Sequence, residues 1–363
     1  MYRVLSVIIT ICCSYILNAA LASDVQKDSI DFCSLVNMVE SNYAGFPTKV
    51  NNSTIVDYSQ FKNRLLNSVL RKERTGFDAA AEFVTWFNDY HLQVGALSKK
   101  YMKSPISYDF INYNPQFLSQ PIDSQTYLIR IPSFAYEDSI VHSIENAIKD
   151  YKQSGIENLI IDIRGNGGGL DYTFDPIFEL IYNRPFLLKS VEFRATPDIS
   201  NLLRESYRSQ NGQPSWALEM ADSIDTGRYD FVSIPNSDKL ISLDKISNLP
   251  HKVAIIIDNG VASSAEQFIV LAKSCSNRVI VFGKDNTMGA LDYSNLMPYD
   301  LPYSKITCYI PTSRTIGINK DNPGVDVSGI APDIMIPIDY PKDLTDNVDS
   351  WVYWVAKELY NQN

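Results

Sequence analysis

The segment that decides the fold is Asn158–Gly169, NLIIDIRGNGGG. Its first half is a short apolar run of the kind found in fully buried β-strands. A polar turn follows at once, with four glycines in the five positions 165–169. Because glycine lacks a side chain, another main chain or a reacting carbonyl can approach closely, and consecutive free amides form an anion-binding nest. Such a nest can hold a phosphate or the oxyanion of acyl transfer.

The glycine turn does not match the common nucleotide-binding motifs. A P-loop would continue with Gly-Lys-Ser/Thr, and the dinucleotide fingerprint spaces its glycines differently. Neither pattern is present around 165–169. The turn by itself therefore leaves two interpretations open, a purely structural turn and an oxyanion site. Arg164, just before it, is expected to anchor the turn or to pair with Asp162.

A second apolar run that ends in a turn lies at Ala254–Phe268, AIIIDNGVASSAEQF. A helix is expected to begin near Ser263. Serine at such a position usually caps its helix, and Glu266 three residues later would complete a capping box. A nucleophile at the same position would gain from the positive end of the helix and from nearby amides. Ser264 is the competing serine.

Strands and helices alternate around these two segments. We predict strands at 127–131, 158–163, 252–257, 278–282 and 304–310, and helices at 139–151, 171–182, 263–276 and about 350–360. Gly155 is the expected C-cap of the first of these helices. Buried apolar strands that alternate with helices are typical of an α/β domain. Residues 190–250 are more polar and are expected to form a helical excursion.

The chain before this domain has the apolar spacing of helices. Residues 30–95 contain several such patterns, and the last of them, Ala80-Val84-Phe87-His91, places His91 on the apolar face of a helix. Asn51–Ser53 reads as a loop between helices. We therefore predict a small helical N-terminal domain at 23–98 and an α/β core domain at 99–363.

Residues 1–22 are typical of a secretory signal peptide. Arg3 precedes a long apolar run, and Ala20-Leu21-Ala22 is a small-residue cleavage pattern. The run approaches spanning length, so an uncleaved anchor is the alternative. Cys12 and Cys13 lack a convincing lipobox. We predict an exported protein, periplasmic or extracellular or held at the cell envelope, with no membrane span once the signal is removed.

Composition excludes several classes of partner and cofactor. The formal charge of −10 argues against nucleic acid and against anionic membrane surfaces. Cys33, Cys275 and Cys308 would remain after cleavage, and their spacing fits neither a zinc site nor a disulfide framework. Because no cluster of His, Cys and carboxylate has metal-ligand spacing, we expect neither a metal nor another cofactor.

The two segments together resemble one family of serine peptidases. It comprises the C-terminal processing (tail-specific) proteases, the tricorn core protease and the interphotoreceptor retinoid-binding repeats. Its members carry a Leu-Ile-Ile-Asp-Leu-Arg-Gly-Asn-Gly-Gly-Gly type segment followed by a Ser-Ala-x-Glu type segment. Asp89-Tyr90-His91 looks like the family's Asp-x-His segment, and the likeness continues through Gly283–Gly289 and Asp326–Asp333. The resemblance implies a crotonase-like α/β core and a peptidase that acts on peptides or unfolded proteins through an acyl-enzyme.

The resemblance also assigns roles to residues. Ser263 would be the nucleophile, because it stands three residues before Glu266. The backbone amides of Gly168 and Ser264 would form the oxyanion hole, with Gly167 as the neighbouring candidate for the glycine.

One departure from the family affects the expected mechanism. Processing proteases use a serine–lysine dyad, with the lysine after Thr-x-Gly, whereas the matching segment Thr287–Leu291 has Ala290 at that position. An alanine cannot take a proton, and Lys284 lies six residues too early. No domain-sized segment separates His91 from the strand at 127–131, so the PDZ module of the processing proteases is also expected to be absent.

Tricorn-like members use a histidine and an acid instead of the lysine. By that resemblance His91 is the general base, since an imidazole can accept and return a proton near neutral pH. A carboxylate would hold its ring. Asp326 is the leading choice, and Asp321 and Glu266 are the alternatives. His142 and His251 lie outside recognisable motifs and are expected to be structural.

Two other functions compete with the peptidase. The family includes retinoid-binding repeats, and the missing lysine is compatible with a catalytically inactive protein that binds a ligand or a peptide on the same fold. An acyl-CoA enzyme of the crotonase type is the weaker alternative, because an export signal separates the protein from that cytosolic cofactor.

Overall fold

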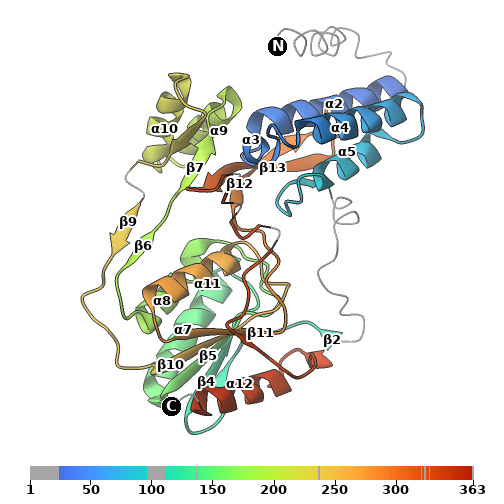
Figure 1. Ribbon diagram of the computed structural model, residues 1–363. Helices are drawn as coiled ribbons and strands as arrows, with labels where there is room; N and C mark the ends of the chain where they lie inside the picture. Colours follow the sequence, from blue (N-terminus) through green and yellow to red (C-terminus); the bar gives the residue numbers. More distant parts are fainter. Residues whose placement is uncertain are drawn as a thin grey trace. The chain divides into compact units, whose positions relative to one another are not determined.

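The computed structural model describes residues 24–95, 112–135, 137–235, 238–319, 321–322, 324–326 and 328–361. The predicted signal peptide lies outside the described residues. The chain forms two compact units: unit 1 comprises Met1–Lys103, Val191–Pro235 and Tyr293–Pro323, and unit 2 comprises Ser104–Ser190, Asn236–Asp292 and Gly324–Asn363. Figure 1 traces both along the sequence. Among the described helices, none has the length and apolar character needed to span a bilayer.

Unit 2 is built on a six-stranded sheet of order β14-β11-β10-β5-β4-β3. Its strands are β3 (Leu118–Pro121), β4 (Thr126–Arg130), β5 (Asn158–Asp162), β10 (Lys252–Ile256), β11 (Val279–Gly283) and β14 (Ile334–Met335). All neighbours run parallel except β3, which pairs antiparallel with β4. The predicted buried strands are thus present, and the expected α/β core is confirmed.

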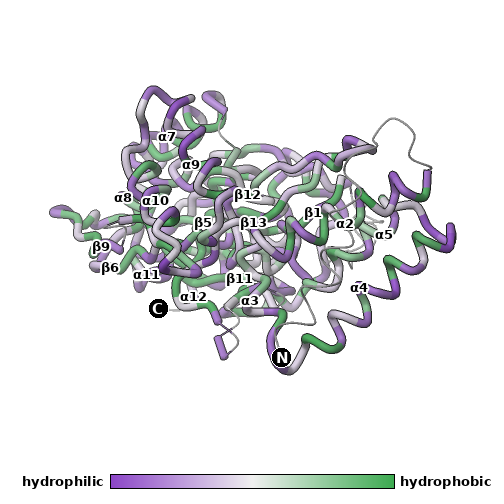
Figure 2. The backbone as a smooth tube through the Cα atoms, turned by 90° about the horizontal axis from the view of Figure 1, so that it is seen from above, coloured by the Kyte–Doolittle hydropathy of each residue, from purple (hydrophilic) through white to green (hydrophobic). Residues whose placement is uncertain are grey.

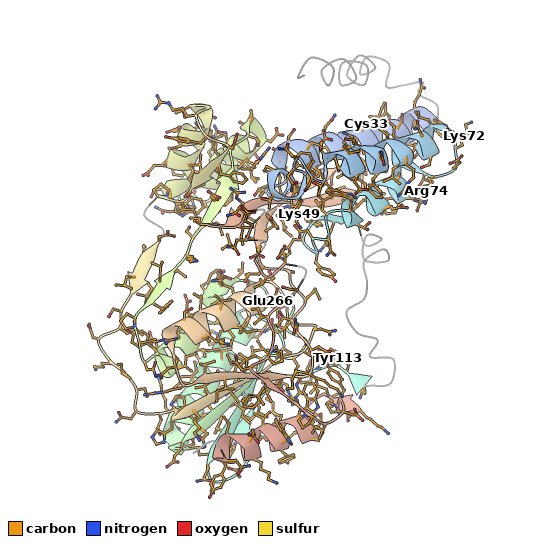
Figure 3. The ribbon with its side chains drawn as sticks, in the orientation of Figure 1. Cys33, Lys49, Lys72, Arg74, Tyr113 and Glu266 are labelled. Atoms are coloured by element: carbon orange, nitrogen blue, oxygen red, sulfur yellow. The ribbon has the colours of Figure 1, made fainter. Side chains whose placement is uncertain are left out.

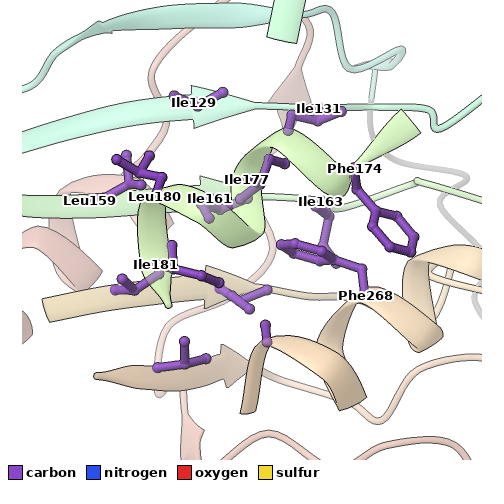
Figure 4. Close-up of a cluster of buried hydrophobic side chains, with 14 of the residues drawn as sticks. Ile129, Ile131, Leu159, Ile161, Ile163, Phe174, Ile177, Leu180, Ile181 and Phe268 are labelled. Carbon is purple, nitrogen blue, oxygen red and sulfur yellow. The ribbon is translucent and has the colours of Figure 1, made fainter. Parts of the chain in front are cut away.

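Helices cover both faces of this sheet (Figure 1). Alternate side chains such as Ile129, Leu159 and Ile161 pack with α7 (Asp138–Ser154), α8 (Asp175–Ile181) and α11 (Ser264–Cys275), as Figure 4 shows. The intervening residues, including Leu128 and Ile160, pack with α12 (Ser350–Asn361) on the other face. This two-residue alternation explains why the central strands are apolar throughout.

The remaining elements of unit 2 are short. They are β2 (Asn112–Tyr113), η1 (Asp171–Thr173), β6 (Phe186–Leu188), β9 (Lys239–Ile241) and β15 (Asp343–Leu344). Strand β2 pairs with β15, and β6 pairs with β9. Helix α7 ends at Gly155, whose φ of 65° is the left-handed C-cap that the sequence predicted.

Unit 1 combines helices with an antiparallel sheet. Its helices are α2 (Asp24–Asn42), α3 (Phe46–Lys49), α4 (Ile55–Leu70), α5 (Gly76–Thr85), α9 (Pro197–Ser209) and α10 (Trp216–Asp225). Its strands are β1 (Gln93–Val94), β7 (Val191–Arg194), β8 (Phe231–Ser233), β12 (Tyr293–Asp300) and β13 (Thr307–Thr315). The tube in Figure 2 alternates between hydrophilic and hydrophobic along α4, as in an amphipathic helix.

The observed units differ from a simple boundary near residue 98, because two later segments join the N-terminal helices. Strand β13 pairs with both β1 and β7, through Gln93↔Tyr309 and Ser313↔Phe193. The core around α2, α4 and α5 also includes Tyr293, Met297 and Ile310. The expected excursion near 190–250 does contain α9 and α10, but strands flank both helices.

The prediction that His91 lies on a helix is wrong. Helix α5 ends at Thr85, and Phe87 and Asn88 make only tight bonds to residues three positions earlier. Asn88 has a φ of 46°, and this left-handed backbone, which asparagine tolerates, stops the helix. His91 therefore lies in the turn before β1.

Four buried charges join β4, β5, the glycine turn and the start of α12. Arg130 and Arg164 each bind both Asp162 and Asp349, with nitrogen–oxygen distances between 2.6 and 3.0 Å. All four side chains are at most 2% exposed. Burial alone would raise the pKa of Asp162, but the guanidinium groups of Arg164 and Arg130 outweigh it and lower the pKa to about 2. Arg164 thus both anchors the turn and pairs with Asp162, as the sequence suggested.

We expect Asp162→Asn to lower the free energy of unfolding by about 3–5 kcal/mol, because it leaves two buried guanidinium groups with a single carboxylate. Urea denaturation at neutral pH measures the loss. Asp150→Asn, at an exposed position of α7, is the control and should change stability by less than about 0.5 kcal/mol.

A comparison of the wild type with Asp162→Asn also tests the lowered pKa of Asp162. Stabilisation by a carboxylate with a depressed pKa is complete above its ordinary value of 3.8 and is lost as the pH falls toward 2. The stability difference between wild type and Asp162→Asn should therefore shrink across that interval. A difference that stays constant down to pH 2 would contradict the ion-pair account.

Candidate active site

Ser263 occupies a strained position directly before α11. Its φ of 57° and ψ of −126° lie in a region that residues with side chains rarely adopt. Such strain persists only where the surroundings enforce it, and it is concentrated at functional sites. The side chain is half-buried, so it is both held and accessible.

Hydrogen bonds fix the main chain around Ser263. Its N–H donates to Glu266 Oε2 at 3.1 Å, which is the return half of the predicted capping box. Its carbonyl accepts from the amides of Glu266 and Gln267 at 2.8 and 3.0 Å. The amide of Ser264 has no partner among the described residues, and it lies at the positive end of the α11 dipole.

The glycine turn lies directly against this serine. A Cβ added to Gly168 would stand 2.8 Å from Ser263 Cβ and 2.9 Å from the Ser264 nitrogen, and Gly168 has a φ of 98°. The hydroxyl of Ser264 donates to the Gly169 carbonyl at 2.8 Å. The two loops singled out in the sequence therefore meet within unit 2. The competing serine, Ser264, uses its hydroxyl to join them.

The amides of the turn are only partly free. Gly168 N–H donates to Asn166 Oδ1 at 2.9 Å, and Asn166 Nδ2 donates to the Ile131 carbonyl at 3.0 Å. In the described part of the chain, the amide of Gly167 has no partner. The three residues expected to bind an oxyanion are thus adjacent to Ser263, with the Gly168 N–H engaged inside the turn.

A buried aspartate ties the glycine turn to the turn after β10. Asp258 Oδ1 accepts the amides of Gly165 and Gly260 at 3.1 and 2.9 Å. Asp258 Oδ2 accepts the Tyr113 hydroxyl at 2.7 Å. Gly165 is required here, because its φ is 75° and an added Cβ would lie 2.5 Å from that hydroxyl.

Glu266 binds the segment in which processing proteases carry their lysine. Its carboxylate accepts the Thr287 hydroxyl at 2.5 Å and the amides of Gly289 and Ala290 at 2.8 Å, besides the Ser263 N–H. Burial raises the pKa of Glu266, and these four donors oppose that effect. Figure 3 labels this residue near the start of α11. Ala290 is itself buried, with 1% of its surface exposed.

Asp326 holds the next two residues of the same segment. Its Oδ1 accepts the amides of Leu291 and Asp292 at 2.8 and 2.7 Å, and its own amide donates to Asp292 Oδ2 at 2.7 Å. Asp326 is 4% exposed. The alternative acid Asp321 lies in an exposed turn of unit 1, where its amide donates to Asn319 Oδ1.

His91 belongs to unit 1 and is half-buried there. Its Nδ1 lies 2.6 Å from the main-chain carbonyl of Tyr293. Because a carbonyl can only accept, Nδ1 carries the hydrogen, and Nε2 is left as the proton acceptor. The ring contact that was expected from a carboxylate is thus made by a main-chain oxygen. The His91 amide donates to Asp89 Oδ1 at 2.8 Å.

The other two histidines are exposed. His142 Nδ1 lies 2.6 Å from the Asp138 carbonyl within α7, and His251 Nδ1 is 3.9 Å from Glu157 Oε2. Cys275 and Cys308 are buried, and Cys33 is half-buried.

Sequence reasoning missed the groups that hold the expected site residues. The contact from Asp89 to an amide two residues later has a local signal, because aspartate commonly forms such turns. The Tyr293 carbonyl has none, since every residue carries a main-chain oxygen. Asp258 has only the local signal of an aspartate that caps a turn, whereas it joins two turns.

We expect Gly168→Ala to destabilise the protein by about 1–3 kcal/mol, because its φ is unfavourable for a side chain and the new Cβ meets main-chain atoms. Gly167→Ala is the matched control, since nothing lies within 4 Å of its added Cβ. Thermal unfolding of both variants measures the difference. Equal stabilities would show that the two loops are not packed as described.

Solved structures with this fold include several proteases and related proteins. Mature CPAF in complex with lactacystin has a TM-score of 0.61 and 12% identity, covering 94% of this chain and 100% of that one. A putative peptidase from Parabacteroides merdae has a TM-score of 0.54 and 15% identity, covering 87% and 90%. A lipoprotein from Streptococcus agalactiae has a TM-score of 0.50 and 16% identity, covering 96% and 100%. At these identities the likeness shows the fold alone.

A sequence comparison places the chain in a family. No curated protein matches it. The model of peptidase family S41 matches residues 125–336, which is more than half of the chain. That range contains the glycine turn, Ser263 and Asp326, whereas His91 precedes it. The chain therefore belongs to peptidase family S41, the tail-specific serine peptidases.

Proposed function

We propose that this peptidase is exported and cleaves peptide bonds through an acyl-enzyme on Ser263. The Ser263 hydroxyl attacks the scissile carbonyl while His91 Nε2 takes its proton. The C–N bond then breaks, the leaving amine receives that proton, and the acyl group stays on Ser263 Oγ as an ester. Water attacks the ester with His91 again as the base, and the proton returns to Ser263.

The observation that carries the proposal is the meeting of Ser263 and the glycine turn. A half-buried serine in a strained backbone, at the start of a helix and against Gly168, is what a nucleophile requires. A serine that only capped its helix would have no need of a positive φ. Because a capping box does not require this backbone, the strain supports a role for Ser263 beyond capping.

The oxyanion is proposed to bind the amides of Ser264 and the glycine turn. Ser264 N–H and Gly167 N–H have no partner in the ranges that the structure describes. Gly168, the leading choice from the resemblance, would exchange its bond to Asn166 Oδ1 for one to the oxyanion. The Ser264 and Gly167 amides need no such exchange, and donors fixed in advance are effective because they require no reorganisation during the reaction.

The proposal for the base rests on the His91 tautomer. With hydrogen on Nδ1, the other nitrogen can accept the serine proton directly. Asp326 is kept in the proposed site in an indirect role: it holds the amides of Leu291 and Asp292, the residues before Tyr293. The substrate is proposed to be a peptide or an unfolded protein outside the cytoplasm, since residues 1–22 have the pattern of a signal peptide.

A binding protein without activity is the second candidate, and Ala290 favours it. The lysine of the serine–lysine dyad is absent. Ala290 occupies its position, with a buried methyl group and a backbone amide that donates to Glu266. A site that had lost its base without replacement would keep such a fold and bind without cleaving.

A fluorophosphonate probe separates the two candidates. We expect the wild type to be labelled and Ser263→Ala to remain unlabelled, because the probe bonds to an activated serine oxygen. Ser264→Ala is the control: it should still be labelled, since the Ser264 hydroxyl is occupied by the Gly169 carbonyl. A wild type that stays unlabelled from pH 6 to 9 would favour the binding protein.

A histidine variant tests the base. We expect His91→Gln to slow labelling by about 10²–10⁴-fold, the range that general base catalysis supplies. His142→Gln should label at the wild-type rate, because its ring is exposed on α7. Unchanged labelling in His91→Gln would remove this residue from the mechanism and leave Ser263 in place.

A further inference from the structure

To act as the base, His91 must hold its ring in one orientation. A set of buried contacts in unit 1 provides this restraint. This inference rests on the proposed function, because it concerns the base of that reaction. It starts from three contacts within unit 1. The ring binds the Tyr293 carbonyl, the His91 amide binds Asp89, and Asp89 binds Tyr43.

Asp89 sets the backbone that carries the histidine. Its side chain is fully buried, and Oδ1 accepts the amide of His91, two residues further on, at 2.8 Å. Asn88 has a positive φ immediately before it, so the chain reverses sharply at this point. An aspartate that binds an amide two residues ahead is a common way to hold such a turn. Without this acceptor, the reversal at Asn88 would leave the His91 amide unpaired.

Tyr43 connects Asp89 to the residue that holds the ring. Its hydroxyl donates to Asp89 Oδ2 at 2.7 Å. Its aromatic ring packs against the ring of Tyr293, with centroids 5.6 Å apart. Tyr43 is fully buried and Tyr293 is 1% exposed. One rigid side chain therefore touches both groups that contact His91, and a shift of either would be transmitted to the imidazole.

Lys49 strengthens the same arrangement from a neighbouring helix. Its Nζ donates to the Phe87 carbonyl at 2.7 Å and lies 4.8 Å from the centre of the Tyr293 ring. Figure 3 labels Lys49 at α3. Hydrogen bonds therefore hold the loop before His91 at Phe87 as well as at Asp89.

We propose that Asp89 is a positioning residue for the general base, acting with Tyr43 and the Tyr293 carbonyl to hold His91 with hydrogen on Nδ1 and Nε2 free. The ring is oriented by a main-chain oxygen, and the carboxylate acts one step away, through the backbone of the histidine. Asp89 does this by accepting hydrogen bonds and not by its charge on the ring.

The same unit offers a control of the same kind. Asp31 is also a buried aspartate, 3% exposed, and it accepts two amides, those of Tyr303 and Ser304, at 2.7 and 2.8 Å. Removing either carboxylate takes one acceptor away from two donors in unit 1. Of these two aspartates, Asp89 is the one that binds His91. The labelling rate of Asp31→Ala therefore measures the effect of lost stability alone.

The experiment compares Asp89→Ala, Asp89→Asn and Asp31→Ala in the full chain. The fluorophosphonate rate is measured as a function of probe concentration, which separates the maximal labelling rate from the concentration that half-saturates the protein. We expect Asp89→Ala to lower the maximal rate by about 10²-fold, because misplacing a catalytic group by about 1 Å has that effect. The half-saturating concentration should change little, since probe binding does not use the imidazole.

The two other variants separate positioning from stability and charge. Asp89→Asn keeps an oxygen for the His91 amide, and its amide group can donate to the Tyr43 oxygen. Its rate should stay within about threefold of wild type. Asp31→Ala should also stay within about threefold, although its thermal unfolding shifts as much as that of Asp89→Ala. Equal losses in the two alanine variants, equal losses in Asp89→Ala and Asp89→Asn, or a wild-type rate in Asp89→Ala would each overturn the proposal.

A second measurement keeps the inference separate from the catalytic assignment. Nitrogen-15 NMR of the imidazole reports which ring nitrogen carries the hydrogen, and His91→Gln identifies the signal. We expect hydrogen on Nδ1 in the wild type and in Asp89→Asn, and a mixture of tautomers in Asp89→Ala. If the wild type is not labelled by the probe, the proposed function fails, whereas these spectra still decide the role of Asp89. If Asp89→Ala keeps the wild-type spectrum, the proposed positioning role of Asp89 is wrong.

Discussion

The site depends on mutual neutralisation of four buried charges, those of Arg130, Asp162, Arg164 and Asp349. Their side chains are almost fully removed from water, so each charge is tolerated only because opposite charges lie within 3 Å. The pairs fix the ends of β4 and β5, and the residue just before the glycine turn, to the start of α12. The turn is thus anchored at its base by the ion pairs, and the Asn166 side chain supports it from within.

Acidic side chains perform a second task around Ser263, which is to hold main-chain amides. Asp258 joins the glycine turn to the turn before the nucleophile, Glu266 joins Ser263 to Gly289 and Ala290, and Asp326 fixes Leu291 and Asp292. A carboxylate accepts several hydrogen bonds at once, so one residue can fasten two loops. The segment that provides a lysine in processing proteases serves here as a fixed support.

Local sequence patterns predicted much of unit 2 and less of unit 1. The buried strands were visible as apolar runs, and α7 was bounded by Gly155, because both signals depend on neighbouring residues. The pairing of β1 with β13 joins residues more than 200 positions apart, and no local pattern encodes it. His91 was assigned to a helix because the apolar spacing continues past Thr85, whereas the backbone at Asn88 ends it. Ser263 and the glycines were found from their motifs, but the Tyr293 carbonyl and the engaged Gly168 amide depend on main-chain geometry.

The position of Asp349 in the chain has a consequence for the order of folding. Every strand of the central sheet precedes it in the sequence, so these strands are synthesised while Arg130 and Arg164 have Asp162 as their only partner in the quartet. An excess positive charge beneath the glycine turn then disfavours closure of the interior. Arrival of α12 removes that excess and covers the second face of the sheet in the same step. The interior beneath the glycine turn therefore depends on the α12 end of the chain for its charge balance as well as for its cover.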